Sequence, residues 1–524
     1  MTIVRIGDGS KAEPAEVIGA KAANLAQMAA IGIPVPPAFV LPIGLCAALA
    51  NGEPRAQREL NDGLAEGIAY LEEKTGRTFG DARAPLLVSV RSGAARSMPG
   101  MLETVLDVGC THAAVRGLTR MTGNPHFAWD CRRRFLESFG EVVLGMGRAS
   151  FAQRLTTLTA GEAMAEQALD SEALERLASA YQQLIEDEDL VVPDDPMEQL
   201  SAAAQAVYRS WTSERARTYR RLQGLEDLRG TAVTVQAMVF GNRGAASGAG
   251  VAFSRDPSTG ANQPVIDVAF GCQGEDVVSG NRTPDTEAAI ARTMPAIAAQ
   301  LHATLTRLER VFGDVQDIEF TIENGQLWIL QTRAAKRTPQ AALRFAIDLV
   351  HEHLITPAEG LKRLHGLDLH ALASTHLVGA PDPVALGTGA ALGIAVGRAA
   401  FTSDSATRFS DGGDPVILLR PDTNTADVAG FAAAAGIVTA VGGRTAHAAL
   451  VARQMGKPCI VGCGALVVDG HGARIGAAAL QEGDWLSIDG ETGAIYLGRC
   501  ETVTERPEAE LREIESWRAA TAAA

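Results

Sequence analysis

Hydrophobic residues near the start of the chain recur at the spacing of a helix. The segment 15–33, "AEVIGAKAANLAQMAAIGI", carries this pattern, and the prolines that follow it in "PVPP" cannot continue a helix. They lead into "AFVLP" (38–42), an unbroken apolar run of the kind found in buried strands. The start of the chain therefore predicts a helix followed by a strand.

The period of the pattern changes several times after that. Residues 84–94, "APLLVSVRSGA", predict a buried strand that runs into a polar, glycine-containing turn. From about 112 to 228 amphipathic helical runs dominate, and "VVPDDP" (191–196) interrupts them. Residues 231–333 return to strand patterns and end in "QDIEFTIENGQLWILQTR".

The second part of the chain begins with a helical pattern over 339–372. Short strands and helices rich in alanine and glycine follow from 383 to 498, and "ERPEAELREIESWRAATAAA" (505–524) predicts a charged helix with a frayed end. A chain of 524 residues is too long for one core, so we expect an α/β protein of two to four domains.

Composition narrows the class of protein. With 46% hydrophobic and 21% charged residues the chain has the balance of a globular protein rather than a disordered one. The formal net charge of −15 argues against nucleic-acid and membrane-surface partners, which demand a basic face. A phosphate-bearing small molecule needs only a local basic pocket and stays possible.

Cysteine usage and the N-terminus bear on the compartment. Seven cysteines are dispersed along the chain, and Cys459 and Cys463 have no second close pair to complete a zinc site. We expect reduced thiols. The N-terminus has no signal-peptide pattern, and no run approaches eighteen apolar residues. We therefore expect a cytoplasmic protein.

The clearest local pattern is the hairpin at 316–331, "QDIEFTIENGQLWILQ". Asp317 and Glu319 alternate with large apolar residues, so one face of the first strand is apolar and the other carries two acids. A three-residue loop ending at Gly325 would place Gln331 across from Asp317. A two-residue Asn-Gly loop would put Gln331 on the apolar side instead. We favour the three-residue loop, because it gathers the polar residues together.

Two carboxylates beside an amide oxygen form a cluster of hard ligands that suits Mg²⁺. Arg333, just beyond the hairpin, would favour a bound phosphate. The alternative is a solvent-facing strand whose acids only keep it soluble, and the hairpin alone does not decide between the two.

Cations lie near strand ends and glycine turns at Lys21, Arg91, Arg255 and Arg333. Taken singly, each is typical of a surface cation; together with the acidic hairpin they indicate phosphate binding. The glycine-rich segment 241–250, "GNRGAASGAG", lacks the Gly-Lys-Ser/Thr ending of a P-loop and is not one.

His447 stands after a Gly-Gly turn and before "AALVARQMG", a helical pattern closed by Gly456 and stopped by Lys457-Pro458. It is therefore expected in the first helical turn, where unpaired backbone N–H groups favour negative charge. Such a histidine can attack phosphorus, and the amides can then hold the new dianion. The alternative is a small-residue helix start in which the histidine is incidental.

The segment around this histidine, "GGRTAHAALVARQMGKPCIVGC", closely resembles the phosphohistidine segment of the pyruvate, phosphate dikinase and phosphoenolpyruvate synthase family. The N-terminal part resembles the family's ATP-grasp region through "GAKAANLAQMAAIGIPVPPAF", "LLVSVRSGAARSMPGMLETVLDVG" and "VQDIEFTIENGQLWILQTRAAKRT". The block "SGAGVAFSRDPSTG" favours the dikinase branch.

The resemblance implies a role for each candidate residue. His447 corresponds to the phosphoryl carrier, and Lys21 and Arg91 correspond to phosphate-binding residues of the nucleotide site. The hairpin residues correspond to ATP and Mg²⁺ ligands, with Asp317 and Glu319 as the metal ligands: Asp317, Glu319, Gln331 and the neighbouring cation Arg333.

This sequence also departs from the family pattern. The dikinase loop usually has Met and Ser where this chain has Arg444 and Ala446, and "IDVAFGCQGE" (266–275) departs from the usual Asn-Ala. The family continues into a (β/α)₈ barrel that binds pyruvate or phosphoenolpyruvate. The sequence stops at residue 524, and Cys500 is not in the context of the barrel's cysteine. Thr445 corresponds to a regulatory threonine of some plant dikinases, and we do not extend that regulation here.

The resemblance implies an α/β multi-domain fold. We expect an ATP-grasp nucleotide-binding domain at 1–338 with a helical insertion at about 112–228, a helical linker at 339–375, a swivelling phosphohistidine domain at 376–500, and a C-terminal helix at 501–524.

The expected reaction is phosphorylation of His447 by ATP in the presence of phosphate and Mg²⁺, giving AMP and pyrophosphate. The phosphoryl group would pass to pyruvate on a barrel supplied by a separate subunit. Two alternatives stay open: a different small-molecule acceptor, and a non-catalytic nucleotide-binding remnant.

Overall fold

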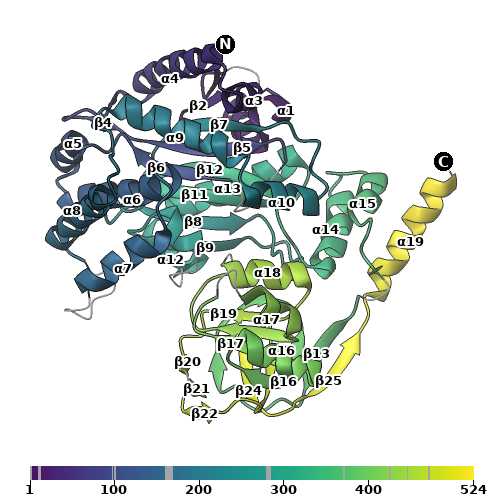
Figure 1. The fold of residues 1–524 in the computed structure, drawn as a ribbon. Helices are drawn as coiled ribbons and strands as arrows, with labels where there is room; N and C mark the ends of the chain where they lie inside the picture. Colours follow the sequence, from purple (N-terminus) through teal and green to yellow (C-terminus); the bar gives the residue numbers. More distant parts are fainter. Residues whose placement is uncertain are drawn as a thin grey trace. The chain divides into compact units, whose positions relative to one another are not determined.

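The computed structural model describes most of the chain, namely residues 3–9, 13–96, 98, 102–159, 169–278, 285–369, 372–423, 427–444, 446–469 and 472–523. These residues form a mixed α/β structure with several sheets, as the alternating pattern predicted (Figure 1). The chain divides into two compact units. The first unit runs to Ser247 and also includes 322–324 and 328–332, and the second contains the rest. The predicted domain boundaries remain predictions.

The first unit is built on a five-stranded antiparallel sheet with one dominant hydrophobic core. The strands in spatial order are β1 (Val4–Ile6), β2 (Ala38–Leu41), β7 (Thr231–Ala237), β5 (Val88–Ala94) and β6 (Thr104–Val108). The two helices α3 (Gly44–Ala50) and α4 (Pro54–Thr75) follow β2, and the short strands β3 (Thr78–Phe79) and β4 (Pro85–Leu86) precede β5. Both predicted buried strands are confirmed.

The predicted first helix is two helices, α1 (Ala15–Ile18) and α2 (Ala20–Ala30). Gly19 separates them with φ +81° and ψ 152°, a conformation almost confined to glycine. A Cβ atom on Gly19 would lie 2.2 Å from the carbonyl oxygen of Gly93. Gly19 therefore lets the start of α2 approach strand β5 closely, and this close approach is not visible in hydrophobic periodicity.

The mostly helical pattern predicted from about 112 to 228 is confirmed for the residues described, while its place as an insertion in a domain remains a prediction. It contains α5 (His112–Thr122), α6 (Pro125–Val142), α7 (Arg148–Thr159), α8 (Ser171–Asp187), α9 (Pro196–Ser210) and α10 (Glu214–Leu222). The "VVPDDP" stretch does interrupt the helices, because Asp195 caps α9 by accepting a hydrogen bond from the Met197 amide.

A second five-stranded sheet carries the predicted hairpin. Its strands in spatial order are β10 (Asp285–Thr286), β9 (Val265–Phe270), β8 (Gly248–Phe253), β11 (Gln316–Glu323) and β12 (Gln326–Ala334). Three helices in this region were not predicted: α11 (Gly274–Val278), α12 (Glu287–Thr293) and α13 (Pro295–Phe312). The longest, α13, buries Ile297, Leu301, Leu305 and Leu308, a helical spacing that the strand patterns on either side overshadowed.

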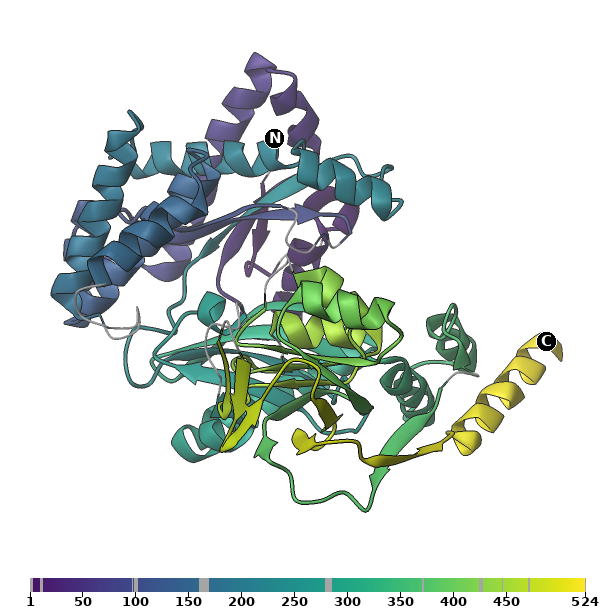
Figure 2. The ribbon, with the colours of Figure 1, turned by 60° about the horizontal axis from the view of Figure 1, so that its bottom comes forward.

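The predicted helical connector contains α14 (Pro339–His351) and α15 (Pro357–Arg363). After it, two-stranded pairing joins β13 (Ser374–Val378) to β25 (Glu501–Glu505), which leads into the final helix α19 (Glu508–Ala523) (Figure 2). The charged C-terminal helix is confirmed, and Trp517 packs it against Gly360 of α15. The strand β25 was not anticipated, since its residues are all exposed.

Residues 385–497 form an eight-stranded sheet with a helical layer on one face. In spatial order the strands are β14 (Ala385–Leu386), β24 (Ala494–Leu497), β23 (Trp485–Asp489), β16 (Ile394–Ala400), β17 (Val416–Arg420), β18 (Gly436–Thr439), β19 (Cys459–Val461) and β15 (Thr388–Ala391). Strands β16 to β19 are parallel, and their crossover helices are α16 (Ser403–Asp411), α17 (Val428–Ala433) and α18 (His447–Met455).

The two faces of this sheet have separate cores. The three crossover helices pack on one core through the small residues Ala406 and Ala449 and the large residue Phe431. The other core is covered by a three-stranded antiparallel sheet of β20 (Leu466–Asp469), β21 (Gly472–Ile475) and β22 (Ala478–Leu480). Apolar contacts on both faces hold the parallel strands and fix the loops at their carboxyl ends.

Two expectations about the environment of the chain can be compared with the structure. None of the seven cysteines, all of which lie in described segments, forms a disulfide. Within the described ranges, the helices that are long enough to span a bilayer are too polar to do so.

Candidate functional site

The acidic face of the hairpin contains a buried ion pair. Asp317 is 3% exposed, and the Nε atom of Arg333 donates a hydrogen bond of 2.8 Å to its Oδ2 atom. Glu319 lies two positions along β11 and is less buried than Asp317. Arg333, the cation expected beside the acids, thus pairs with Asp317 in the second unit, and its role toward phosphate remains a prediction.

Burial dominates the electrostatics of this pair. It raises the pKa of the Asp317 carboxyl, and the Arg333 guanidinium offsets only part of this shift. Burial alone would lower the pKa of Arg333, but the Asp317 and Glu319 carboxylates raise it above its usual value. Arg333 therefore stays charged, and ionised Asp317 depends on a nearby cation.

The turn of the hairpin differs from the one we favoured. Only Asn324 and Gly325 separate the strands, and both have positive φ, +49° and +74°. This is the two-residue turn typical of type I′ hairpins, so the three-residue prediction was wrong. Positive φ at both turn residues matches the right-handed twist of the two strands. This backbone preference outweighs the grouping of polar side chains that a three-residue loop would have given. Gln331 lies two and four positions beyond the buried Ile329 and Leu327, so a regular strand places it on their apolar face, and it is itself 9% exposed.

The donor set on this hairpin fits Mg²⁺ shared with a nucleotide. Among the described residues, no three His, Cys, Asp or Glu side chains form a group able to hold a metal ion by themselves. Mg²⁺ is commonly bound by one or two carboxylates together with substrate phosphates and water. Asp317 and Glu319 supply those two carboxylates, so the residues suit this mode of binding and not a metal cage made of protein alone.

The first unit positions the other predicted cations. Lys21 is in the first turn of α2, two residues after Gly19, and Arg91 lies on β5, two residues before Gly93. The close approach of Gly19 to Gly93 therefore brings the segments that carry these two cations together. Within the described residues the side chain of Arg91 makes no hydrogen bond or ion pair, and it is half-buried.

Helix α2 is also tied to strand β12. The side chain of Asn24, one turn after Lys21, donates a hydrogen bond of 2.9 Å to the backbone carbonyl of Thr332. Thr332 follows Gln331, so this bond holds the helix of Lys21 beside the strand of Gln331. Asn24 was not singled out from the sequence, because a polar residue on a helix gives no sign of a partner 308 positions away.

The loop before His447 lies at the carboxyl end of parallel strand β18, where ligands bind in open α/β sheets. Helix α18 begins at His447 and ends at Gly456, which has the left-handed conformation expected of a C-cap. The structure describes the backbone of His447 but not its side chain, and Thr445 lies outside the described residues. The predicted position of the histidine in the first turn is confirmed.

The start of α18 has no side-chain cap. Its N-cap residue is Ala446, which carries no oxygen to accept the first amide hydrogens. Among the described helices, α5 and α14 have such caps, Thr111 and Thr338, whereas the long helices α4 and α13 have none. The first amides of α18 therefore lack an acceptor from Ala446, and an anion can supply one.

Three contacts fix the backbone around this loop. Gly442 has φ +109°, the amide of Ala446 donates to the carbonyl of Gly443 at 3.0 Å, and Nε of Arg444 donates to the carbonyl of Gly389 at 3.0 Å. Beyond the helix, the ammonium of Lys457 donates to three carbonyls at the end of α17. Arg444 thus anchors the loop, which gives a structural account of this departure from the family pattern.

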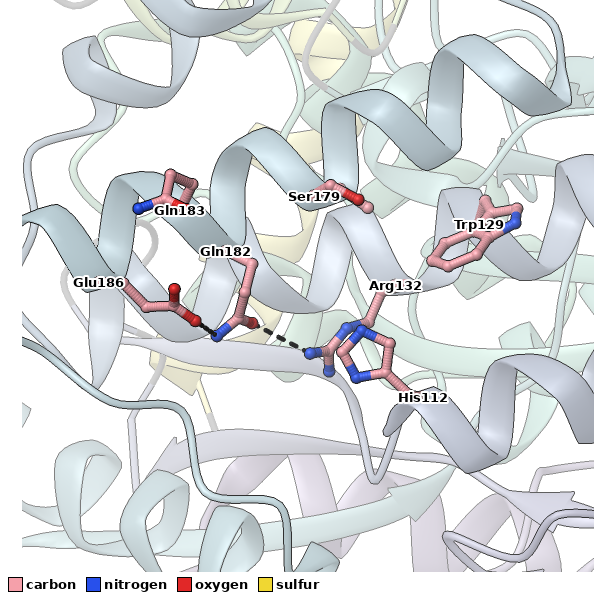
Figure 3. Close-up of a pocket in the computed structure, with 8 residues that line it drawn as sticks. His112, Trp129, Arg132, Ser179, Gln182, Gln183 and Glu186 are labelled. Carbon is pink, nitrogen blue, oxygen red and sulfur yellow. Dashed lines mark hydrogen bonds between the residues drawn. The ribbon is translucent and has the colours of Figure 1, made fainter.

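A cavity of about 120 Å³ in the helical insertion involves none of the predicted residues (Figure 3). Arg132 donates to Oε1 of Gln182 at 3.1 Å, and the Gln182 amide donates to Glu186 at 2.9 Å. His112 and Trp129 also line it. The Gln182 amide bridges the Arg132 guanidinium and the Glu186 carboxylate. Because these two charges are opposite, the cavity has little net charge.

Comparisons with known proteins match two segments of the chain to family models. The family model for the pyruvate phosphate dikinase AMP/ATP-binding domain matches residues 55–302 and 295–353, more than half of the chain. The chain belongs to the pyruvate, phosphate dikinase family. The model for the mobile domain of PEP-utilising enzymes matches residues 412–493, which include His447.

Relatives within the pyruvate, phosphate dikinase family share about two residues in five with this chain. The pyruvate, phosphate dikinase of Clostridium symbiosum is 40% identical over 519 residues, which are 96% of this chain and 58% of that protein. That of Rhizobium meliloti is 41% identical over 527 residues, 97% of this chain and 58% of the relative. Pyruvate, phosphate dikinase 2 of Zea mays is 41% identical over 496 residues, in an alignment that covers 92% of this chain and 56% of that protein. The chain spans a little over half the length of these relatives.

Proposed function

We propose that this chain phosphorylates His447 with ATP and phosphate, releasing AMP and pyrophosphate. The observation that carries the proposal is the start of α18 at His447 without a side-chain cap, inside the segment that matches a mobile PEP-utilising domain. The imidazole nitrogen forms a bond to the β-phosphorus of ATP, and the bond between that phosphorus and AMP breaks. The γ-phosphoryl group passes to phosphate as pyrophosphate, so all phosphorus atoms are accounted for.

The cations of the nucleotide site act on the transferring groups. Lys21 and Arg91, carried by the segments that meet at Gly19 and Gly93, bind the phosphates and orient them. Arg333 is held by Asp317 at 2.8 Å, so its guanidinium is already positioned before nucleotide binds. Gln331 contributes an amide to the same nucleotide site.

Asp317 and Glu319 are the proposed ligands of Mg²⁺, which enters with ATP. When bound, the ion neutralises charge on the phosphates. Burial raises the pKa of Asp317, and Arg333 offsets part of this shift, which favours the ionised form that a metal ligand requires.

The phosphohistidine domain acts as a carrier. After transfer, the first amides of α18 donate to the phosphoryl oxygens and stabilise the dianion. One imidazole cannot contact the nucleotide and a distant acceptor at the same time, so the domain that contains His447 moves between them.

The proposed acceptor is pyruvate, which the names of the relatives specify for those proteins. We propose that the barrel that presents pyruvate is supplied in trans. Purification of the chain from its native cells should then recover a second protein, and addition of that protein should allow pyruvate to discharge phospho-His447. Recovery of the chain alone, in a form that discharges to pyruvate unaided, would contradict supply in trans.

The half-reaction is tested by a single turnover with enzyme in excess over ATP. We expect AMP to form in an amount equal to the added ATP when Mg²⁺ is present, and an equal amount of pyrophosphate to form only when phosphate is also present. Formation of ADP in place of AMP, or pyrophosphate formation that does not depend on phosphate, would contradict the proposal.

A further inference from the structure

A cavity of about 530 Å³ in the second unit is lined by residues of α14, α15 and α18 and of the segments that follow β12 and α15. We propose that this cavity binds an organic anion with an apolar body, and that the bound anion restrains α18. It is separate from the predicted nucleotide residues, none of which lines it.

The main evidence is the guanidinium of Arg453, on α18. The residue is 1% exposed and lines the cavity. Its Nε atom donates to the carbonyl of Ala390 at 3.0 Å, and its guanidinium carbon lies 5.4 Å from the centre of the Phe253 ring. Within the described residues its two terminal nitrogens have no hydrogen-bond partner and no carboxylate within salt-bridge distance. An unsatisfied buried charged group is costly, and an anion in the cavity would satisfy it.

The other charged groups of the cavity leave an excess of positive charge. Arg337 and Arg363 share the single carboxylate of Asp314, at 2.7 and 3.4 Å. Lys336 also lines the cavity, is exposed, and has no ion pair among the described residues. Four cations and one acid line the cavity, and Glu359, outside the lining, pairs with Arg363 at 3.3 Å; the lining still has an excess of positive charge in a chain whose net charge is −15. This local excess selects for an anion and against a metal ion.

The remaining wall is apolar, and an inorganic ion would not cover it. This wall consists of Phe345, Ala346 and Leu349 of α14 and of Leu367, which follows α15 in the sequence. The volume of about 530 Å³ falls within the range of small-molecule sites. A ligand with an anionic group for Arg453 and Lys336 and an aromatic or aliphatic body for this wall meets both requirements.

The site bears on the proposed carrier motion. Arg453 and Gln454 lie on the helix that begins at His447, while the apolar wall belongs to the linker helix α14. A ligand that contacts both would oppose movement of α18 relative to the linker. This regulatory consequence rests on the proposed function, whereas binding itself does not.

Binding is tested with the full chain and the fluorescent aromatic anion 8-anilino-1-naphthalenesulfonate. We expect Lys336→Ala to weaken binding about tenfold and Ala342→Trp, which fills the cavity from α14, to abolish the saturable phase. Lys362→Ala is the matched control, because Lys362 is exposed on α15 and does not line the cavity. Thermal unfolding shows whether each variant is folded.

Two further ligands sharpen the test. The uncharged N-phenyl-1-naphthylamine should bind at least tenfold more weakly than the sulfonate, and inorganic phosphate at millimolar concentration should not displace the dye. ATP should not displace it either, since the sites are separate. Equal dye affinity in wild type, Lys336→Ala and Ala342→Trp, or displacement by ATP, would overturn the proposed site.

The regulatory arm uses the single-turnover formation of AMP. The dye should slow AMP formation in the wild type and have no effect in Ala342→Trp. Inhibition that persists in Ala342→Trp would overturn the restraint on α18. If no AMP forms in any sample, the proposed function fails, while dye binding still decides the site.

Discussion

The acidic hairpin and the start of α18 differ in whether their charged or polar groups already have partners within the protein. At the hairpin, buried Asp317 is already paired with Arg333 before any ligand arrives. At the start of α18, the N-cap is Ala446 and offers no acceptor to the helix amides. The first region is a preorganised site, and the second is left incomplete. Under the proposed function, the paired hairpin binds nucleotide in every cycle, whereas the start of α18 holds the phosphoryl charge only after transfer to His447.

The largest expected effect comes from neutralising the hairpin acid. Asp317→Asn should lower the rate of AMP formation about 10²- to 10³-fold, because it removes a proposed Mg²⁺ ligand and the partner that positions Arg333. The control Asp411→Asn, an exposed acid on α16, should keep the wild-type rate. Single-turnover rates measure both.

Stability separates a catalytic role of Asp317 from a structural one. Because the folded-state pKa of Asp317 is raised, its ionised form costs stability at neutral pH, and this cost disappears as the pH falls through that pKa. Asp317→Asn should therefore leave the melting temperature unchanged or raise it. A large fall in melting temperature together with the lost activity would contradict the assignment.

The next effect concerns the close approach behind Lys21 and Arg91. Gly19→Ala should destabilise the protein by about 3 kcal/mol or more, because the new Cβ atom would lie 2.2 Å from the Gly93 carbonyl oxygen. Gly32→Ala is the matched control: Gly32 also has positive φ, +74°, but no atom within 4 Å of its Cβ position. It should cost only about 1 kcal/mol. Chemical unfolding measures the difference, and equal losses would show that the contact with Gly93 does not matter.

A smaller effect is expected in the pH dependence of Mg²⁺ binding. Mg²⁺ requires ionised carboxylates, so its affinity should fall by up to tenfold per pH unit once Asp317 takes up a proton. The raised pKa means that this fall begins at a higher pH than for an exposed aspartate, whose pKa is about 4. Titration calorimetry with Mg²⁺ and a non-hydrolysable ATP analogue would follow it. An affinity that holds constant to pH 4 would contradict the account.

The smallest expected effect is at the helix start. Ala446→Ser supplies the missing N-cap oxygen and should stabilise the protein by about 0.5–1 kcal/mol. Ala47→Ser, in the middle of α3 and exposed, should instead cost a few tenths of a kcal/mol. If both substitutions have the same sign in thermal unfolding, the amides of α18 are already satisfied and the contrast with the hairpin is lost.

Local patterns in the sequence predicted what depends on neighbours along the chain. The α/β class, the helical insertion, the connector and the start and end of the helix at His447 all follow from periodicity, prolines and glycines. The family was recognised from long motif blocks and is shown by the comparisons. The roles of the seven candidate residues remain predictions.

Features set by distant contacts were not predicted. The break at Gly19 depends on Gly93, the bond from Asn24 depends on Thr332, and the burial of Arg453 depends on Ala390 and Phe253. The prediction of a three-residue hairpin loop was wrong for another reason. We weighed the grouping of polar side chains above the backbone preference of Asn-Gly, and the backbone preference decided the turn.

The most direct test of the central claim is the transfer of label to the protein itself. Wild-type chain incubated with β-³²P-ATP, phosphate and Mg²⁺ should become labelled in an acid-labile form, and His447→Ala should carry no label. An unlabelled wild-type protein under these conditions, or equal labelling of the His447→Ala variant, would contradict the account.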